Sequence, residues 1–346
     1  MSNGFLCNDG VKCRSNQAKE ENNMRRKRIL TLTMNPSLDF STSVDHVIPG
    51  LKLRCESMRS DPGGGGINVS RVIARLGGET VAVYTSGDEE GLELSRTLER
   101  EGVGLLPVNI GAHTRRSFAV RERKSGNQFR FVPPGHDLGP DEWSHCLEVV
   151  ERGLDEAGLA VASGSLPGGV PEDFYGRVAA LCRDRDIPFI LDTSGPALRA
   201  AIQKTEMYLL KPNMAELGFL HGAQIQTDED METAARELIW RHKVKVVVVS
   251  LGAGGVVLCT GDRLERMRTP TVPQRSRVGA GDSMVGAIAV KLALGSPIHK
   301  AVSYGLAAGA AAVMTPGTEL CRREDVDKLY ARLAGEGENA LEELER

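Results

Sequence analysis

The sequence lacks most of the features that would place a protein in a special structural class. Its 346 residues contain seven cysteines, an odd number, with no C-x-x-C pair and no histidine cluster at the spacing of metal ligands. This scatter excludes a disulfide framework and a zinc site, so we expect free thiols in a reducing cytoplasm. No apolar run reaches the about 18 residues of a membrane span. Lys and Arg total 43 against 46 Asp and Glu, so no basic excess predicts nucleic-acid binding.

Two common phosphate-binding motifs are also missing. The glycine-rich segments GGGGIN and GAGGVV do not complete the G-x-G-x-x-G pattern of dinucleotide-binding proteins, and no G-x-x-x-x-G-K-[ST] segment occurs. These absences exclude a dinucleotide-dependent oxidoreductase and a P-loop nucleotide site. A small anionic substrate remains open, because a few local Arg and Lys residues suffice to bind it.

The composition is that of a globular chain with a sizeable core, since 41% of the residues are hydrophobic and 26% are charged. Residues 1–25 are polar, carry mixed charge and lack the apolar segment of a signal peptide, which predicts a disordered extension. We expect a single domain over residues 26–335, followed by a short C-terminal tail at 336–346.

Apolar runs alternate with helical patterns along the body of the chain. The runs are nearly continuous, as in strands that are covered on both faces, and the alternation predicts an α/β fold with a mostly parallel sheet between helices. We expect strands at 28–36, 80–86, 103–109, 157–165, 187–195, 207–213 and 245–255, and helices at 66–77, 89–101, 171–184, 213–221, 228–242 and 280–294.

Residues 40–60 and 114–132 break this pattern. Polar and apolar residues alternate there, as in SFAVRERKSGNQFRFV, where the S-G-N triplet indicates a turn. These segments predict antiparallel strands outside the main sheet, and we call them the lid.

The segment RVGAGDSMVG, residues 277–286, carries the strongest chemical signal. Gly279, Ala280 and Gly281 allow close approach of a ligand, and their N–H groups at a helix start suit the charge on a phosphoryl group in transfer. Asp282 would then take a proton from an attacking hydroxyl. From the pattern alone, a plain helix cap by Asp282 is an equal alternative.

A second glycine run, PGGGGINVSR at residues 62–71, also precedes a helix. Backbone N–H groups at such a point bind phosphate well, so a nucleotide loop is one interpretation. The alternative is close approach of the backbone to a sugar, with Asn68 as a side-chain ligand or as a helix cap.

Both glycine segments resemble the two signatures of the ribokinase-like (PfkB) carbohydrate kinases. The resemblance is collinear from about residue 28 to 330, through TMNPSLD, KLRC, SGSLPGGV, LDTSG, LLKPNMAEL and VVVSLGAGG. PSLD, KLRC and GGGGINV together are most similar to the ATP-dependent 6-phosphofructokinase branch. The resemblance implies transfer of the ATP γ-phosphate to the 1-hydroxyl of fructose 6-phosphate, with 1-phosphofructokinase, tagatose-6-phosphate kinase or an inactive sugar-phosphate sensor as alternatives.

The resemblance also implies roles for individual residues. Asp282 becomes the general base, with Gly279, Ala280 and Gly281 as the anion hole. Arg115 and Arg130 match phosphate-binding positions, Arg116 beside them remains a candidate, and Arg121 and Arg123 are read as solvated. The implied substrate-binding residues are Asp39, Gly64, Gly65, Asn68, Arg115, Arg130 and Ser165.

A further group of residues is implied to bind ATP and magnesium. Asn213 and Glu216 match the N-x-x-E motif, although Asn at an N-cap with Glu three residues later is also a capping box. Asp192 and Glu216 would bind magnesium, partly through water. The implied nucleotide-binding residues are Lys52, Lys211, Asn213, Glu216, Ser250, Gly252 and Gly255.

Two further expectations follow from the resemblance. A potassium site would involve Ser276, Val278, Ala312 and Gly317, although Glu319 stands where this branch carries an arginine. The related kinases pair their lids, so we expect a homodimer through the lid, where exposed sheet edges would otherwise remain unpaired.

Overall fold

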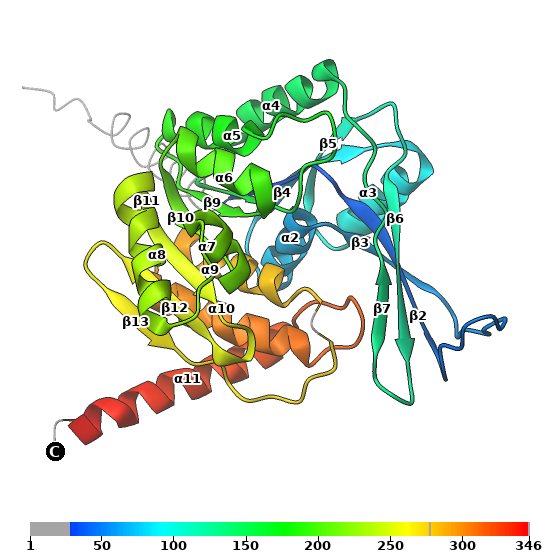
Figure 1. The fold of residues 1–346 in the computed structure, drawn as a ribbon. Helices are drawn as coiled ribbons and strands as arrows, with labels where there is room; N and C mark the ends of the chain where they lie inside the picture. Colours follow the sequence, from blue (N-terminus) through cyan, green and yellow to red (C-terminus); the bar gives the residue numbers. More distant parts are fainter. Residues whose placement is uncertain (1–27, 277, 345–346) are drawn as a thin grey trace, which may run out of the picture.

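A sheet of nine strands forms the centre of the molecule (Figure 1). The computed structural model describes residues 28–276 and 278–344, so the predicted N-terminal extension lies outside the described residues. The strand order is β13-β12-β11-β10-β9-β8-β1-β4-β5. The bounds are β1 Ile29–Thr33, β4 Thr80–Ser86, β5 Gly104–Asn109, β8 Leu159–Ser163, β9 Phe189–Asp192, β10 Met207–Leu210, β11 Val244–Ser250, β12 Val256–Thr260 and β13 Leu264–Met267.

The sheet is parallel from β5 to β11, and its last two strands run antiparallel as a hairpin. The predicted mostly parallel sheet is therefore confirmed. Strands in the middle are buried on both faces, as their near-continuous apolar runs require. Because the strands are parallel, their carboxyl ends meet at one edge, where the polar ends of β1, β8 and β9 come together.

Helices cover both faces of the sheet (Figure 1). One core joins the sheet to α2, α9, α10 and α11, and a second joins it to α4, α5, α6 and α8. The helices are α2 Gly65–Arg75, α3 Asp88–Arg100, α4 Pro140–Leu154, α5 Phe174–Arg183, α6 Gly195–Lys204, α7 Met214–His221, α8 Asp228–His242, α9 Ala280–Ala293, α10 Ile298–Val313 and α11 Arg323–Leu344, with a 3₁₀ turn at Gly252–Gly254.

The lid is a separate sheet of four strands in the order β3-β2-β6-β7, which projects beside the main body (Figure 1). Its strands are β2 Ser37–Val44, β3 Arg59–Gly63, β6 Arg115–Glu122 and β7 Gln128–Phe131. The two outer pairs are antiparallel, as predicted, whereas the central pair of β2 and β6 is parallel. The parallel pair arises because both strands leave the main sheet in the same direction.

Several elements carry no expectation from the sequence. These are α4, α6, α10, α11 and the β12–β13 hairpin. Helix α10 is buried along most of its length, so no polar stripe interrupts its apolar residues and no helical period stands out. The residues that we set apart as a C-terminal tail continue α11 as far as Leu344.

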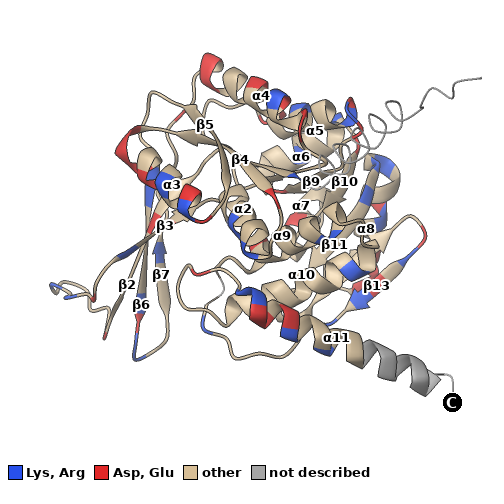
Figure 2. Cartoon of the chain, turned by 180° about the vertical axis from the view of Figure 1, so that it is seen from behind, with Lys and Arg blue, Asp and Glu red and all other residues tan. Residues whose placement is uncertain are grey.

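Charged residues of both signs are interspersed over the outer helices, as α4 and α11 show in Figure 2. This mixture accords with the small net charge of −3. In the described part of the chain, we find no helix with the length and apolar character needed to cross a membrane.

Candidate active site

The start of α9 lies at the carboxyl edge of the sheet. Its N-cap residue, Gly279, has φ 76°, a left-handed conformation that favours glycine. A Cβ on Gly279 would lie 2.6 Å from Leu320 Cδ2, so packing also requires glycine at this position. The first N–H groups of a helix lack intrahelical acceptors, so those of Ala280 and Gly281 can bind an anion.

Asp282 lies in the first turn of α9, and its side chain is half-buried. Burial and the nearby carboxylate of Asp192 raise its pKa to about 7, although Asn68, Lys211 and Arg130 act in the opposite direction. The Nδ2 group of Asn68 donates a hydrogen bond to Asp282 Oδ2 over 2.8 Å. A carboxylate with a pKa near neutrality, held by an amide, is suited to accept a proton at physiological pH. The N-cap residue of α9 is Gly279 and Asp282 lies inside the first turn, so the alternative that Asp282 is the N-cap of this helix is wrong.

Two adjoining cavities meet at the start of α9. A cavity of about 370 Å³ opens toward the lid, and Gly279 and Asp282 line it. A second cavity of about 490 Å³ lies on the other side, and Ala280 and Gly281 line it. The first contains the predicted residues Asp39, Gly64, Gly65, Asn68, Arg115, Arg130, Ser165, Asp192, Glu216 and Val278, and the second contains Lys211, Ser250, Gly252 and Gly255.

The glycine run at 63–66 packs α2 against the ends of two strands. Gly64 has φ 112° and serves as the N-cap of α2. A Cβ on Gly65 would overlap Ser163 and lie 2.9 Å from the Gly164 nitrogen, and one on Gly66 would overlap the end of β1. The run therefore brings the helix start close to the strands and leaves the Gly64–Gly65 backbone exposed in the lid-side cavity. It does not line the second cavity, where most of the predicted nucleotide ligands lie, so its place in the fold does not support the nucleotide-loop interpretation.

Three charged residues connect the two cavities. The Nζ atom of Lys211 lies 3.1 Å from Asp192 Oδ1, and both side chains are mostly buried. Burial acts to lower the pKa of Lys211, but Asp192, Glu216 and Asp282 more than offset this and raise it. Lys211 is therefore a fixed cation between the cavities. Burial raises the pKa of Glu216, and Asp192 contributes in the same direction.

Asn213 and Glu216 form the capping box at the start of α7. The backbone N–H of Glu216 donates to Asn213 Oδ1, and the N–H of Asn213 donates to Glu216 Oε2, both over 2.9 Å. The structural alternative is thus present. A carboxylate has two oxygens with several lone pairs, so Glu216 can still accept a further ligand toward Asp192.

Comparison with known proteins identifies the fold and the family. The model of the pfkB family carbohydrate kinases matches residues 33–325. The chain belongs to this family. The enzyme is 45% identical to the ATP-dependent 6-phosphofructokinase isozyme 2 of Mycobacterium tuberculosis over 88% of this chain and 89% of the relative. It is 40% identical to the isozyme 2 of Escherichia coli over 89% of this chain and 99% of that one.

Solved structures give the same result. The crystal structure of phosphofructokinase-2 from E. coli in complex with potassium has a TM-score of 0.84 at 40% identity, covering 89% of this chain and 99% of that chain. Its complex with fructose-6-phosphate has a TM-score of 0.82 at 39% identity, with the same coverage. Ribokinase from Thermotoga maritima, at 25% identity, has a TM-score of 0.70 and covers 87% of this chain and 98% of that chain. The predicted family and the predicted ribokinase-like fold are confirmed, and the protein is a phosphotransferase that acts on a carbohydrate.

The lid arginines of the kinase differ in where they point. Arg115 lines the lid-side cavity and donates to the backbone oxygens of Asn35 and Pro133, over 3.0 and 3.2 Å. Burial lowers its pKa, and Asp39 partly offsets this. Arg116, one residue later, faces the other way and pairs with Glu90 on α3, so its proposed share in the site is wrong.

Arg121 of β6 and Arg123, which follows that strand, have burial or partners that the sequence does not indicate. Arg123 is exposed and pairs with Asp45 and Glu56. Arg121 is half-buried, and its Nε has no hydrogen-bond partner among the described residues. The expectation of a simply solvated Arg121 is therefore wrong.

Two predicted nucleotide ligands, Lys52 and Asn213, are absent from the described lining of both cavities. Asn213 caps α7, as described above. Lys52 is exposed in the loop between β2 and β3 and is absent from the described lining of both cavities. Its predicted role within one chain is therefore not supported by its place in the fold.

The predicted potassium residues come together from the loop before α9, the last turn of α10 and the loop that follows α10. The hydroxyl of Ser276 donates to the Gly317 oxygen over 2.7 Å and accepts the Val278 N–H over 3.2 Å. Thr315 Oγ1 donates to the Ala312 oxygen over 2.7 Å. These carbonyl oxygens keep a second lone pair, so the donor set fits a weakly hydrated cation. Glu319, which departs from the pattern, pairs with Arg322 at 2.9 Å.

Sequence reasoning missed several lining residues. Ser117 lies two positions after Arg115 on β6, so the period of a strand could have placed both on one face. Thr193 and Ser194 follow Asp192 at the end of β9. The loop at 269–274 lines the second cavity and carries no signal that the sequence alone would reveal.

A larger hollow of about 790 Å³ lies at the opposite, amino-terminal edge of the strands, beside Leu159 and Tyr208. It does not include the residues of the two glycine motifs. Ligands of open α/β sheets bind at the carboxyl ends of the strands, which favours the pair of cavities at α9 as the site.

Proposed function

We propose that the protein is an ATP-dependent 6-phosphofructokinase, which transfers the ATP γ-phosphoryl group to the 1-hydroxyl of fructose 6-phosphate. The observation that carries this proposal is the place of Asp282, where a lid-side cavity with two arginines adjoins a second cavity with Lys211. The names of the two similar bacterial enzymes and the complex of E. coli phosphofructokinase-2 with fructose-6-phosphate support the choice of substrate.

The proposed reaction needs one proton transfer and one phosphoryl transfer. Asp282 accepts the proton of the 1-hydroxyl while the oxygen of that hydroxyl forms a bond to the γ-phosphorus of ATP. The bond between the γ-phosphorus and the β–γ bridging oxygen breaks, and ADP leaves with that oxygen. Asn68 holds the carboxylate of Asp282 toward the acceptor. The N–H groups of Gly279, Ala280 and Gly281 stabilise the negative charge on the transferring group.

The remaining lid-side residues bind the sugar phosphate in this proposal. Arg115 and Arg130 bind its phosphate, because guanidinium groups match phosphate with paired hydrogen bonds. Arg115 has five N–H donors, and its contacts with backbone oxygens leave some of them for the phosphate. Asp39, Ser165 and the Gly64–Gly65 backbone face the sugar hydroxyls.

ATP and magnesium are the cofactors that the proposed activity requires. Lys211, Ser250, Gly252 and Gly255 line the nucleotide cavity. Asp192 and Glu216 fit a magnesium ion, since both side chains line the lid-side cavity and magnesium takes few protein ligands. When bound, the ion neutralises charge on the nucleotide phosphates. The loops of Ser276 and Gly317 would hold potassium, which is present in one similar E. coli structure.

A coupled assay of ADP release tests the substrate. We expect turnover with fructose 6-phosphate to exceed that with fructose 1-phosphate, tagatose 6-phosphate and unphosphorylated sugars. A preference for fructose 1-phosphate would identify the protein as a 1-phosphofructokinase instead, and a preference for tagatose 6-phosphate would identify it as a tagatose-6-phosphate kinase. Absence of turnover with every acceptor, together with binding of sugar phosphate, would favour a sensor.

The proposal includes a homodimer through the lid. Three phenylalanine side chains of β6 and β7 are exposed, namely Phe118 at 40%, Phe129 at 37% and Phe131 at 59%, and Phe118 lies opposite Phe131 in the register of the two strands. A patch of this kind on a projecting sheet favours a protein interface. We expect a dimer in analytical ultracentrifugation, and a double substitution of Phe118 and Phe131 by serine should shift it to monomer. A monomer in the unchanged protein would contradict the proposal, and a tetramer, as in the inhibited form of E. coli phosphofructokinase-2, would extend it.

We also propose a cytoplasmic location. Cys55, Cys146, Cys182, Cys259 and Cys321 are free in the structure, and free thiols are typical of a reducing compartment. Activity in the cytosolic fraction after cell fractionation supports this location, and activity confined to an oxidising compartment contradicts it.

A further inference from the structure

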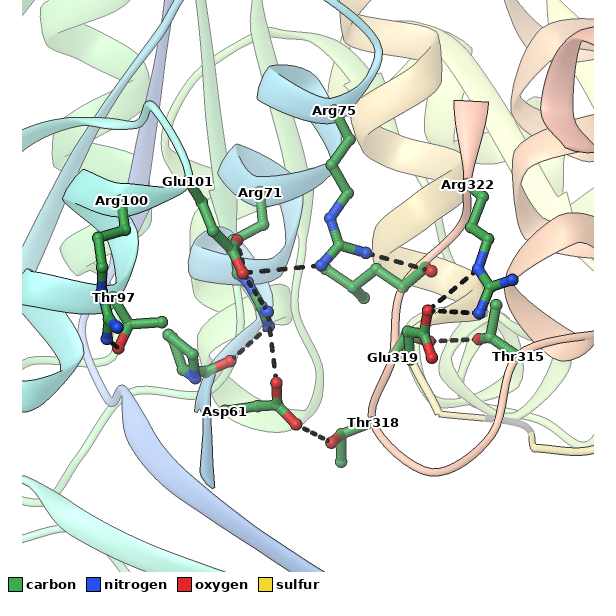
Figure 3. A network of polar contacts seen from close by, with 12 residues as sticks. Asp61, Arg71, Arg75, Thr97, Arg100, Glu101, Thr315, Thr318, Glu319 and Arg322 are labelled. Carbon is green, nitrogen blue, oxygen red and sulfur yellow. Dashed lines mark hydrogen bonds and ion pairs between the residues drawn. The ribbon is translucent and has the colours of Figure 1, made fainter. Parts of the chain in front are cut away.

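One face of α2 carries three polar side chains that reach different parts of the molecule. Asn68, Arg71 and Arg75 are spaced by three and four residues and therefore lie along one side of the helix. Asn68 binds Asp282, as described above. Figure 3 shows the other two, which lie in a network of polar contacts between the base of the lid and the loop before α11.

Arg71 is the centre of this network, and its side chain is only 1% exposed. Its Nε and one terminal nitrogen donate to the two carboxylate oxygens of Glu101, over 2.7 and 2.8 Å. The other terminal nitrogen donates to the Pro62 oxygen over 2.9 Å. Asp61 Oδ1 lies 3.6 Å from the terminal nitrogen that contacts Glu101. A buried guanidinium with two carboxylates and a carbonyl holds the end of β3 against α2.

Asp61 extends this network to the loop at 314–322. Thr318 Oγ1 donates to Asp61 Oδ2 over 2.9 Å (Figure 3). One residue earlier, a Cβ on Gly317 would lie 4.0 Å from Ser41 Oγ on β2. The loop therefore contacts β3 of the lid and passes beside β2. Asp61 is 4% exposed and lies opposite Asp39 in the register of β2 and β3.

The same loop contacts the start of α9 from its other side. Leu320 packs against Gly279, the residue that begins the anion hole. Arg75 donates to the Leu320 oxygen over 3.2 Å, and Ser276 donates to the Gly317 oxygen over 2.7 Å. A displacement of this loop would therefore move the groups around the N-terminus of α9.

We propose that Thr318 and Asp61 are positioning residues for phosphoryl transfer. Their hydrogen bond joins the lid, which covers the acceptor, to the loop that packs on Gly279. The position of the lid therefore fixes the position of this loop, and the loop fixes the geometry of the anion hole. Neither side chain lines either cavity in the described part of the chain. The proposal rests on the proposed function for the identity of the acceptor, and it adds residues that act through the loop and not on the substrate.

The test is Thr318→Val, which removes the hydroxyl and keeps the shape of the side chain. We expect kcat to fall at least about fivefold, because small misplacement of groups that bind the transition state is costly, while KM for the sugar phosphate stays within about twofold. Thr318→Ser should restore kcat to within about twofold of the original protein. Thr97→Val is the matched control, since the half-buried Thr97 accepts a hydrogen bond from Arg100 in the same region without contacting the loop.

Asp61→Asn tests the same hydrogen bond from its acceptor side. Arg71 keeps Glu101 as its partner in this variant, so its buried charge remains paired. We expect the same loss of kcat, and the double variant should lose no more than about twofold beyond either single change. Calorimetric titration of the sugar phosphate should give an unchanged affinity in Thr318→Val. The proposal is overturned if Thr318→Val leaves kcat unchanged or changes KM alone, or if Thr97→Val loses as much kcat. It is also overturned if Thr318→Ser does not restore kcat, or if the losses of kcat in the double variant are additive.

The acceptor in these assays is the one that the unmodified enzyme phosphorylates fastest in the substrate panel. An enzyme that prefers another sugar phosphate would contradict the proposed function. The ratio of kcat between each variant and the original protein would still measure the effect of the Thr318–Asp61 hydrogen bond. An enzyme that phosphorylates none of them overturns both proposals.

Discussion

Replacing Asp282 with asparagine is expected to lower kcat by at least about 10²-fold, which is the typical loss when a general base is removed. KM for the sugar phosphate should change little, because its phosphate is bound at Arg115 and Arg130 on the lid. Asparagine has nearly the same shape, and its Oδ1 can still accept the hydrogen bond of Asn68. Steady-state kinetics with saturating ATP measure both constants. A kcat close to that of the original protein would end the proposed mechanism.

Thermal unfolding controls for damage to the fold in Asp282→Asn. The pKa of Asp282 is raised from 3.8 to about 7 in the folded protein, so the folded state holds this proton more tightly than the unfolded chain. Its contribution to stability therefore falls as pH rises from about 4 to about 7 and stays low above that window. We expect the asparagine variant at pH 8 to melt at the same temperature as the original protein or at a higher one.

The same pKa predicts the acid limb of the pH profile. The base must be deprotonated, so kcat/KM of the original enzyme should fall about tenfold per pH unit below about 7. This ratio reports the free enzyme, which corresponds to the structure. The residual activity of Asp282→Asn should lack this limb, and an identical limb in the variant would assign it to another group.

The second large effect is expected for Arg115→Ala, which should raise KM for the sugar phosphate at least about tenfold. A hydrogen bond between charged groups contributes about 1.5–3 kcal/mol, and each 1.4 kcal/mol corresponds to a factor of ten. The values of KM come from initial rates over a wide range of sugar phosphate. Turnover at saturation should fall much less than in Asp282→Asn, because the reacting hydroxyl lies at the other end of the sugar.

The chain supplies a matched control for this variant. Arg116 is the next residue on the same strand but pairs with Glu90 outside the cavity. Arg116→Ala should therefore leave KM for the sugar phosphate unchanged. Arg115 also binds backbone oxygens near Asn35, so Arg130→Ala provides a second substitution in the proposed phosphate site. A similar KM in all three variants and the original protein would remove Arg115 and Arg130 from that site.

The glycine motifs illustrate how far the sequence leads. Their spacing excluded two nucleotide-binding folds, and their resemblance to one family predicted the fold and class of enzyme, which the comparisons confirm. The geometry then separates the two runs. The first packs α2 against Ser163 and β1 and lines the lid-side cavity, while Ala280 and Gly281 of the second line the other cavity.

Other features depend on contacts between segments far apart in the chain. Asn68 and Asp282 are separated by 214 residues, and nothing near Asn68 indicates that it binds this carboxylate. Arg115 and Arg116 are equivalent by composition, but alternate side chains of a strand point to opposite faces. The fold decides which of those faces the cavity.

The sequence by itself determined the parallel strands of the main sheet, the sheet class, the family and the chemical type of the residues near the reaction. These properties depend on local spacing and on motifs that a single segment contains. Only the tertiary structure decided which groups meet: Asn68 with Asp282, Lys211 with Asp192, and Thr318 with Asp61. The reason is physical, because a pKa or a hydrogen bond depends on distance and burial, which packing sets and local sequence does not.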